Sequence, residues 1–223
     1  NQIELADGGF TVSSILRDQI SEWNPKAKKF SVIQNGYEDD LFNLKSEPLG
    51  IKEKLGLFGK MVVFVGALGP WHGTDELAEI AKVNPHISVV VAGGGYGHNL
   101  PKLRNLHYIG RLERHEVPGL LVEADIGLAP YPNVDYGFSP LKIYEYMGCN
   151  LPVVATLLPS VEEATQGHAL LVRPGQMADA ISKIIDNEKL LSELSVSAFK
   201  YASRERTWSK TIEKTIELYK GLL

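Results

Sequence analysis

Short, mostly apolar runs alternate with helical patterns from Met61 onward, and this alternation constrains the fold more than any other feature. The runs are MVVFV (61–65), ISVVVA (87–92), LHYIG (106–110), DIGLAPY (125–131), PVVAT (152–156) and ALLV (169–172). Strands that are apolar at successive positions are buried on both faces, which is typical of parallel sheets covered by helices. The sequence therefore predicts an α/β fold: a Rossmann-like parallel sheet with helices on both faces, which binds ligands at the carboxyl ends of its strands.

Helical periodicity fills the intervals between these runs. It predicts helices over 74–83, 113–124, 139–149, 160–166 and 175–187, and two extra C-terminal helices over 188–203 and 207–222. Before Met61, the sequence predicts a helix over 10–23 with Ser13 as its cap, then a short strand over 30–34. The stretch 38–59 is interpreted as a connector with one helical turn around 51–55.

Composition excludes several classes of protein. A hydrophobic content of 44% and a charged content of 22% are ordinary for a soluble globular chain. The net charge of −4 gives no cationic field for nucleic acid. No run reaches the roughly 18 to 20 apolar residues of a membrane span, and the first residues lack a basic and apolar export signal. We therefore expect a cytoplasmic protein that does not bind nucleic acid, with its one cysteine, Cys149, buried as a thiol.

The strongest candidate site follows the run 125–131. Ser139 and Pro140 are the residue types that a helix prefers at its cap and first position, so they predict a helix that opens at 139. Lys142 then falls in the first turn, where the helix dipole disfavours a cation unless an anion lies there. First-turn amides and an ammonium predict a phosphate site. The alternative is a solvated lysine whose stem lies along the helix.

Glu145 lies three residues after Lys142, on the same face of the predicted helix. Its carboxylate could accept two hydrogen bonds from a vicinal diol such as a ribose, while Lys142 holds the attached phosphate. The alternative is a simple salt bridge between Glu145 and Lys142. Both interpretations stay open from the sequence.

Three further loops supply candidate ligand contacts. Gly66 permits close approach of the backbone to a ligand, and His72 in the same loop is a candidate donor to phosphate, although a loop histidine is often incidental. Gly94 lies in a glycine-rich turn whose spacing does not match a dinucleotide fingerprint, because His98 stands where the last glycine should be. Arg111 follows another strand and either faces the same cleft or lies on the surface.

Motifs of metal and hydrolase chemistry are absent from the sequence. It contains no HExxH, no paired CxxC, no GxSxG and no P-loop. We therefore expect no metal and no cofactor.

Three segments resemble one family: EYMGCNLPVVAT (145–156), VFVGALGPWHG (63–73) and TWSKTIEKTIELYKGL (207–222). They are similar to the C-terminal, donor-binding half of a GT-B glycosyltransferase of the family 4 (group 1) type, and the resemblance runs over nearly the whole chain. It implies transfer of a hexose from a nucleoside diphosphate sugar to a hydroxyl acceptor, with retention, in bacterial polysaccharide or glycoconjugate synthesis. The nucleotide sugar would be a substrate, not a cofactor.

The resemblance assigns roles to individual residues. Glu145 matches the second glutamate of the family's E-x7-E motif, which implies binding of the ribose hydroxyls. Leu141 and Lys142 fall where the family presents backbone amides to the diphosphate. Gly66 matches the glycine that lets the first loop approach the phosphates.

The sequence departs from the family at two places within the site. Gly137 stands where the first glutamate of the motif, which usually holds the donor sugar, is expected. The arginine and lysine of the family's first loop fall at Ala67 and His72. We hypothesise that Lys142 supplies the missing phosphate-binding charge.

The resemblance also implies a division of the chain. Residues 1–45 match the end of an N-terminal domain and the crossing from it, residues 46–205 the donor-binding domain, and residues 206–223 the returning helix. The acceptor site belongs to the rest of the N-terminal domain, so we expect the chain alone to be inactive. Peripheral membrane association of the full-length enzyme stays open, and so do two alternatives: a sugar-nucleotide epimerase of the same fold and a non-catalytic binding module.

Overall fold

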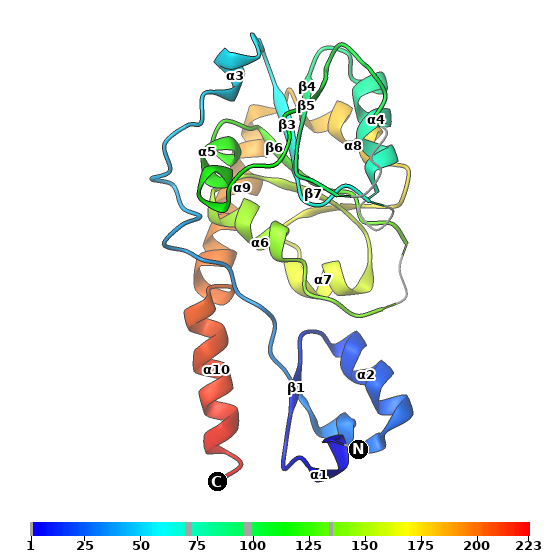
Figure 1. Ribbon diagram of the computed structural model, residues 1–223, viewed down its shortest axis with the longest axis vertical. Helices are drawn as coiled ribbons and strands as arrows, with labels where there is room; N and C mark the ends of the chain where they lie inside the picture. Colours follow the sequence, from blue (N-terminus) through cyan, green and yellow to red (C-terminus); the bar gives the residue numbers. More distant parts are fainter. Residues whose placement is uncertain (1, 70–72, 96–99, 134–135) are drawn as a thin grey trace.

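A six-stranded parallel sheet forms the main body of the protein, in the strand order β5-β4-β3-β6-β7-β8 (Figure 1). The computed structural model describes residues 2–69, 73–95, 100–133 and 136–223. The strands are β3 (Met61–Val65), β4 (Ser88–Ala92), β5 (Leu106–Tyr108), β6 (Ile126–Ala129), β7 (Val153–Thr156) and β8 (Leu170–Val172). Each predicted apolar run contains one strand, and every neighbouring pair is parallel, as predicted.

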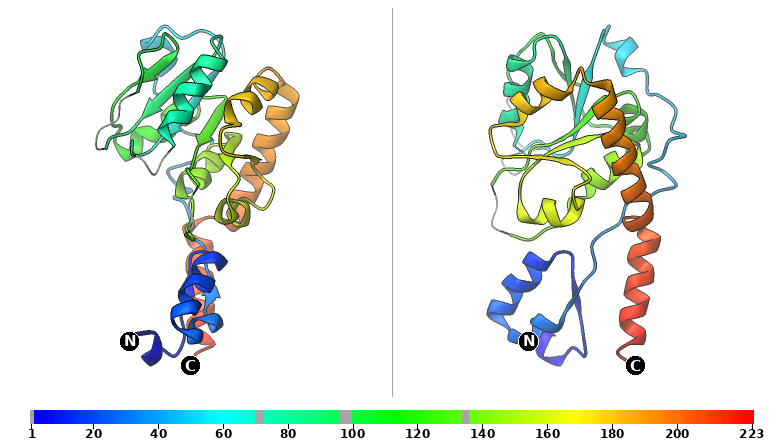
Figure 2. Two further views of the ribbon diagram at one scale, coloured as in Figure 1. Left: turned by 90° about the vertical axis from the view of Figure 1, so that its right-hand side faces the viewer. Right: turned by 180° about the vertical axis from the view of Figure 1, so that it is seen from behind.

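Helices cover both faces of this sheet (Figure 2). One face packs on α5 (Val117–Leu121), α6 (Leu141–Gly148), α7 (Pro159–Thr165) and α9 (Glu188–Glu205), and the other on α4 (Thr74–Val83) and α8 (Met177–Ile184). Successive strand residues point to opposite faces: Val63 packs in the core with Ile143 of α6, whereas Val62 packs with Leu77 of α4. Both faces are covered, which explains why most positions of the strands are apolar.

A smaller part precedes the sheet. It contains α1 (Gln2–Leu5), β1 (Phe10–Thr11), α2 (Ser14–Trp23), η1 (Pro25–Lys29) and β2 (Ser31–Val32), and α3 (Ile51–Lys54) lies in the connector. The strands β1 and β2 form a separate parallel pair. The last helix, α10 (Trp208–Lys220), extends beyond the main body, so both termini lie at the same end of the molecule (Figure 1).

Two predicted helices differ most from the bounds expected. The helix predicted from residue 10 begins at Ser14, because residues 10–11 pair with β2; Ser13 is its cap, as predicted, and accepts a hydrogen bond from the Leu16 amide. The helix predicted over 113–124 is shorter and divided into η3 (Arg114–Glu116) and α5, with Pro118 in the first turn of α5. A proline has no amide hydrogen for a helix that continues through it, so the new helix begins there.

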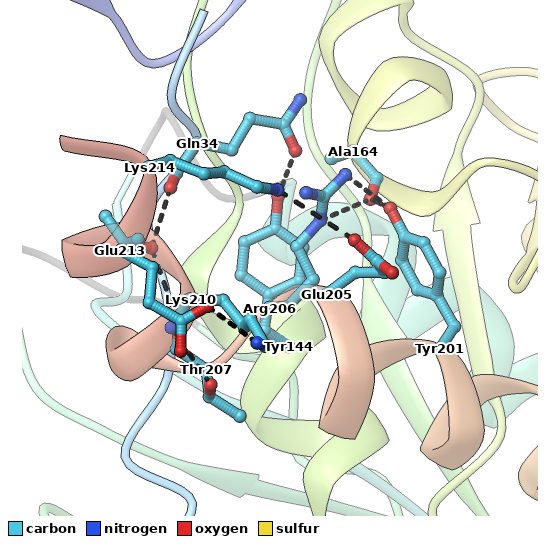
Figure 3. A network of polar contacts seen from close by, with 11 residues as sticks. Gln34, Tyr144, Ala164, Tyr201, Glu205, Arg206, Thr207, Lys210, Glu213 and Lys214 are labelled. Carbon is cyan, nitrogen blue, oxygen red and sulfur yellow. Dashed lines mark hydrogen bonds and ion pairs between the residues drawn. The ribbon is translucent and has the colours of Figure 1, made fainter. Parts of the chain in front are cut away.

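The two crossings between the parts of the molecule lie side by side. The Tyr37 amide donates to the Arg206 carbonyl at 2.8 Å, and the Trp208 amide donates to the Tyr37 carbonyl at 3.2 Å. Gly36 has no room for a Cβ against the Thr207 and Trp208 backbone. Figure 3 shows the polar network at this place, in which the Tyr144 hydroxyl of α6 donates to the Gln34 side chain at 3.0 Å.

Candidate functional site

The carboxyl edge of the sheet contains a slot of about 360 Å³ between the loops that follow β3, β4 and β5. Its lining includes Gly66, Gly94 and Arg111, three of the predicted site residues, together with Leu112 and Val117. Most of its lining residues are glycine or apolar, and the glycines leave the backbone of these loops open to close approach by a ligand. The three loops meet because β3, β4 and β5 are neighbouring parallel strands whose carboxyl ends lie at the same edge of the sheet.

The start of α6 differs from the prediction. The helix begins at Leu141, and Pro140, with φ −84° and ψ 78°, is its N-cap, without a side-chain capping bond. The prediction that Ser139 caps this helix is therefore wrong. The reason is that the backbone leaves the helical region at Pro140, so the Ser139 side chain lies one residue too early, and its carbonyl instead accepts from the Leu141 amide at 3.1 Å.

The Lys142 ammonium is shielded from solvent, although part of the residue is exposed. It lies 4.2 Å from the ring centroid of Phe64 and has no hydrogen-bond partner among the described residues. Burial lowers the pKa of this amine to about 7, against the opposing effect of Glu145. A solvated lysine is therefore excluded. Leaving a buried cation without a partner is costly, and sites of this kind concentrate where ligands bind.

Gly66 provides the space that the ammonium occupies. A Cβ at this position would lie 2.8 Å from Lys142 Nζ, so a side chain here would displace the lysine. In this structure Gly66 therefore lies against Lys142, and its predicted approach to a ligand stays a prediction. Gly66 thus lines the slot and also contacts the side chain of Lys142 from the first turn of α6.

Glu145 is paired with an arginine that the sequence did not indicate. Arg114 Nη1 lies 3.1 Å from Glu145 Oε1, and Arg114 also binds Glu38 at 2.7 Å. The interpretation of Glu145 and Lys142 as a simple salt bridge is therefore wrong, because Glu145 pairs with Arg114 instead. Burial raises the pKa of Glu145, and Arg114 opposes that rise. Nothing in the sequence pattern marked Arg114, because 31 residues separate it from Glu145.

The glycine at the position of the expected first glutamate has a packing explanation. A Cβ at Gly137 would collide with the Leu16 backbone and the Ser13 hydroxyl at the start of α2. The Gly137 amide also donates to the Gln19 side chain at 3.1 Å. No larger side chain fits there in this arrangement. The nearest acid in sequence, Asp135, lies outside the described residues.

An acid that the sequence analysis missed lies at the start of α2. Glu163 of α7 accepts hydrogen bonds from the Ser14 amide at 3.0 Å and from the Ser14 hydroxyl at 3.0 Å. A side chain of the main body thereby accepts from the N-terminus of α2, which belongs to the smaller part of the molecule.

His72 lies outside the described residues, so its candidate role stays a prediction. Among the residues that the structure describes, no three histidine, cysteine, aspartate or glutamate side chains are grouped so as to hold a metal ion. In the same residues, none of the helices has the length and apolar character to cross a membrane.

Comparisons with solved structures show where this fold occurs. The structure of Anabaena Alr3699/HepE in complex with UDP-glucose superimposes with a TM-score of 0.83 at 19% identity, covering 97% of this chain and 64% of that one. The C-terminal domain of a glycosyl transferase group 1 family protein (LpcC) from Francisella tularensis has a TM-score of 0.61 at 19% identity, covering 77% of this chain and 99% of that one. At these identities the likeness establishes the fold.

Sequence comparison identifies the family. D-inositol 3-phosphate glycosyltransferase of Mycolicibacterium smegmatis is 24% identical over 227 residues, which is 90% of this chain and 49% of that protein. The chain spans about half the length of the curated relatives it matches. The profile of the family described as glycosyl transferases group 1 matches residues 59–187, more than half of the chain. The chain therefore belongs to the group 1 glycosyltransferase family.

Proposed function

We propose that this chain is the donor-binding part of a glycosyltransferase that transfers a hexose from a nucleoside diphosphate sugar to a hydroxyl acceptor. One observation carries the proposal: the buried Lys142 ammonium lies beside Gly66 at the start of α6 and has no anionic partner among the described residues. A diphosphate would provide that partner, in a position that the helix dipole also favours.

Three portions of the nucleotide sugar, the base, the ribose and the diphosphate, can each be assigned to a different part of the site. The base would occupy the slot beside Gly94, Arg111 and Leu112, and Glu145 would accept hydrogen bonds from the ribose. The diphosphate would lie against the first turn of α6, beside Gly66 and the Lys142 ammonium. This chain holds the leaving group by charge and dipole, which is how such groups are stabilised in the transition state. Retention of configuration and a role in bacterial polysaccharide or glycoconjugate synthesis follow from the resemblance and are part of the proposal.

The acceptor site would come from residues outside this chain, since the chain spans about half the length of its curated relatives. Residues 1–45 and 206–223 would then belong to the interface with that other half, and the nucleotide-binding domain would comprise residues 46–205. We expect the 223-residue chain alone to bind the donor and not to transfer sugar. Sugar transfer by the isolated chain, measured with radiolabelled donors and simple sugar acceptors, would contradict this expectation.

Calorimetric titration with UDP, GDP and ADP, with and without an attached hexose, tests the donor proposal. We expect one base to be preferred, and the corresponding nucleoside without phosphate to bind far more weakly. If none of the six ligands binds, the chain is a non-catalytic module and the proposal is wrong. Release of free sugar from a bound donor would instead favour the epimerase alternative.

A further inference from the structure

Arg114 joins two carboxylates from distant parts of the chain. Its Nη1 donates to Glu145 Oε1 at 3.1 Å, and its Nε donates to Glu38 Oε2 at 2.7 Å. The guanidinium also lies 5.1 Å from the centroid of the Phe42 ring. Three contacts on different sides of one planar group fix its orientation, which a lysine could not do with a single rotatable ammonium.

This arrangement leaves the Glu145 carboxylate able to bind a diol. An ionised carboxylate has about four acceptor positions, and the described contact with Arg114 uses one of them. Two hydroxyl groups can therefore still donate to Glu145 while Arg114 holds it. Arg114 belongs to η3, which lies between Leu112 and Val117 of the slot lining, so this contact borders the place proposed for the nucleoside.

Charge matters at this position because the Glu145 side chain is only 15% exposed. Burial favours the protonated acid, which would lose acceptor capacity, and Glu38 acts in the same direction. The two cations that face Glu145, Arg114 from η3 and Lys142 from its own helix, favour the carboxylate. Arg114 makes the larger contribution, through its charge and through its hydrogen bond.

We propose that Arg114 is the positioning residue of the ribose site, holding the Glu145 carboxylate ionised and oriented against Glu38 and Phe42 so that it accepts from both ribose hydroxyls. This inference rests on the proposed function. It adds a residue that acts through Glu145, and it connects ribose recognition to the segment that follows the crossing at Tyr37.

The test compares ribose selectivity in four proteins: the unsubstituted chain, Arg114→Gln, Arg114→Lys and the control Arg104→Gln. Arg104 precedes β5, at the opposite edge of the sheet, and is exposed. Each protein is titrated with UDP, GDP and ADP and with their 2′-deoxy counterparts, over the acidic and neutral pH range. We expect Arg114→Gln to reduce the preference for the ribonucleotide by about tenfold, and Arg104→Gln to leave it unchanged.

The pH profile separates positioning from a merely structural role. Without Arg114 the pKa of Glu145 rises further, so binding of the ribonucleotide should fail at a higher pH on the acid side in Arg114→Gln. Arg114→Lys, which keeps the charge and loses the fork, should restore the pH profile more fully than the selectivity.

Two results would overturn the inference while leaving the proposed function intact. One is that Arg114→Gln keeps the ribose preference and the pH profile of the unsubstituted chain. The other is that it weakens both nucleotide forms equally without moving the profile. If the unsubstituted chain binds no nucleoside diphosphate, the proposed function itself fails and the inference fails with it.

Discussion

Two helices begin at the carboxyl edge of the same sheet, and they treat their N-termini in opposite ways. In α4, which follows β3, Asp75 and Glu76 lie in the first turn and neutralise the positive end of the helix dipole. In α6, which follows β6, the first turn contains no acidic residue and holds Lys142 instead. The first helix compensates its own dipole, whereas the second does not, and the anion site proposed at α6 rests on this contrast.

The contrast between α4 and α6 predicts that Lys142 is needed for binding of a nucleoside diphosphate. We expect Lys142→Ala to weaken binding of the preferred nucleoside diphosphate by about 3 kcal/mol, roughly a hundredfold, because a desolvated charge pair is lost. Calorimetry measures the change. Lys82→Ala is the matched control, because Lys82 is in the last turn of α4 and pairs with Glu79 at the surface. An unchanged affinity in Lys142→Ala would refute the assignment of the diphosphate to α6.

Lys142 should also lower the free energy of unfolding of the chain when no ligand is bound. We expect Lys142→Met to raise the free energy of unfolding at neutral pH by roughly 2 kcal/mol, since it removes an unpaired buried cation. Chemical denaturation measures this change. A loss of stability would mean that the ammonium has a structural partner.

The pH dependence of stability has a definite sign. Burial lowers the folded-state pKa of Lys142 to about 7, below its ordinary value of 10.5, so the unfolded chain binds more protons between these values. The destabilising effect is complete below the folded-state pKa and disappears as the pH rises towards the unfolded one. The unsubstituted chain should therefore approach the stability of Lys142→Met by up to ~1.4 kcal/mol per pH unit in that window. A constant difference would contradict the lowered pKa.

The smallest effect is expected at α4. Glu76→Gln removes one first-turn charge but keeps an oxygen that can accept from the Gly175 amide, so we expect a loss of about 0.5 kcal/mol in unfolding free energy. Nucleotide affinity should not change. Thermal denaturation and the titration above check both expectations. A marked change in affinity would place a ligand contact at α4 and weaken the contrast.

Much of the fold could be predicted because apolar continuity is a local property: each run could be assigned to a strand without knowledge of its neighbours. The site was less accessible. Lys142 was found from its unusual place in the first turn of a helix. That its ammonium is buried depends on contact with Phe64 of β3, which the sequence pattern does not show. Arg114 and the obstruction at Gly137 depend on contacts between segments far apart in sequence, which periodicity cannot reveal.

The pairing of the two crossings at Tyr37 has a mechanical consequence. Two chain segments that exchange backbone hydrogen bonds form a narrow ribbon, and sliding one along the other breaks those bonds, whereas rotation about the pair preserves them. Gly36 has no space for a side chain, so the two segments are in direct backbone contact there. The parts on either side are thus joined by a short paired crossing, and the hydrogen bonds of Ser14 to Glu163 and of Gly137 to Gln19 hold them together at a second place.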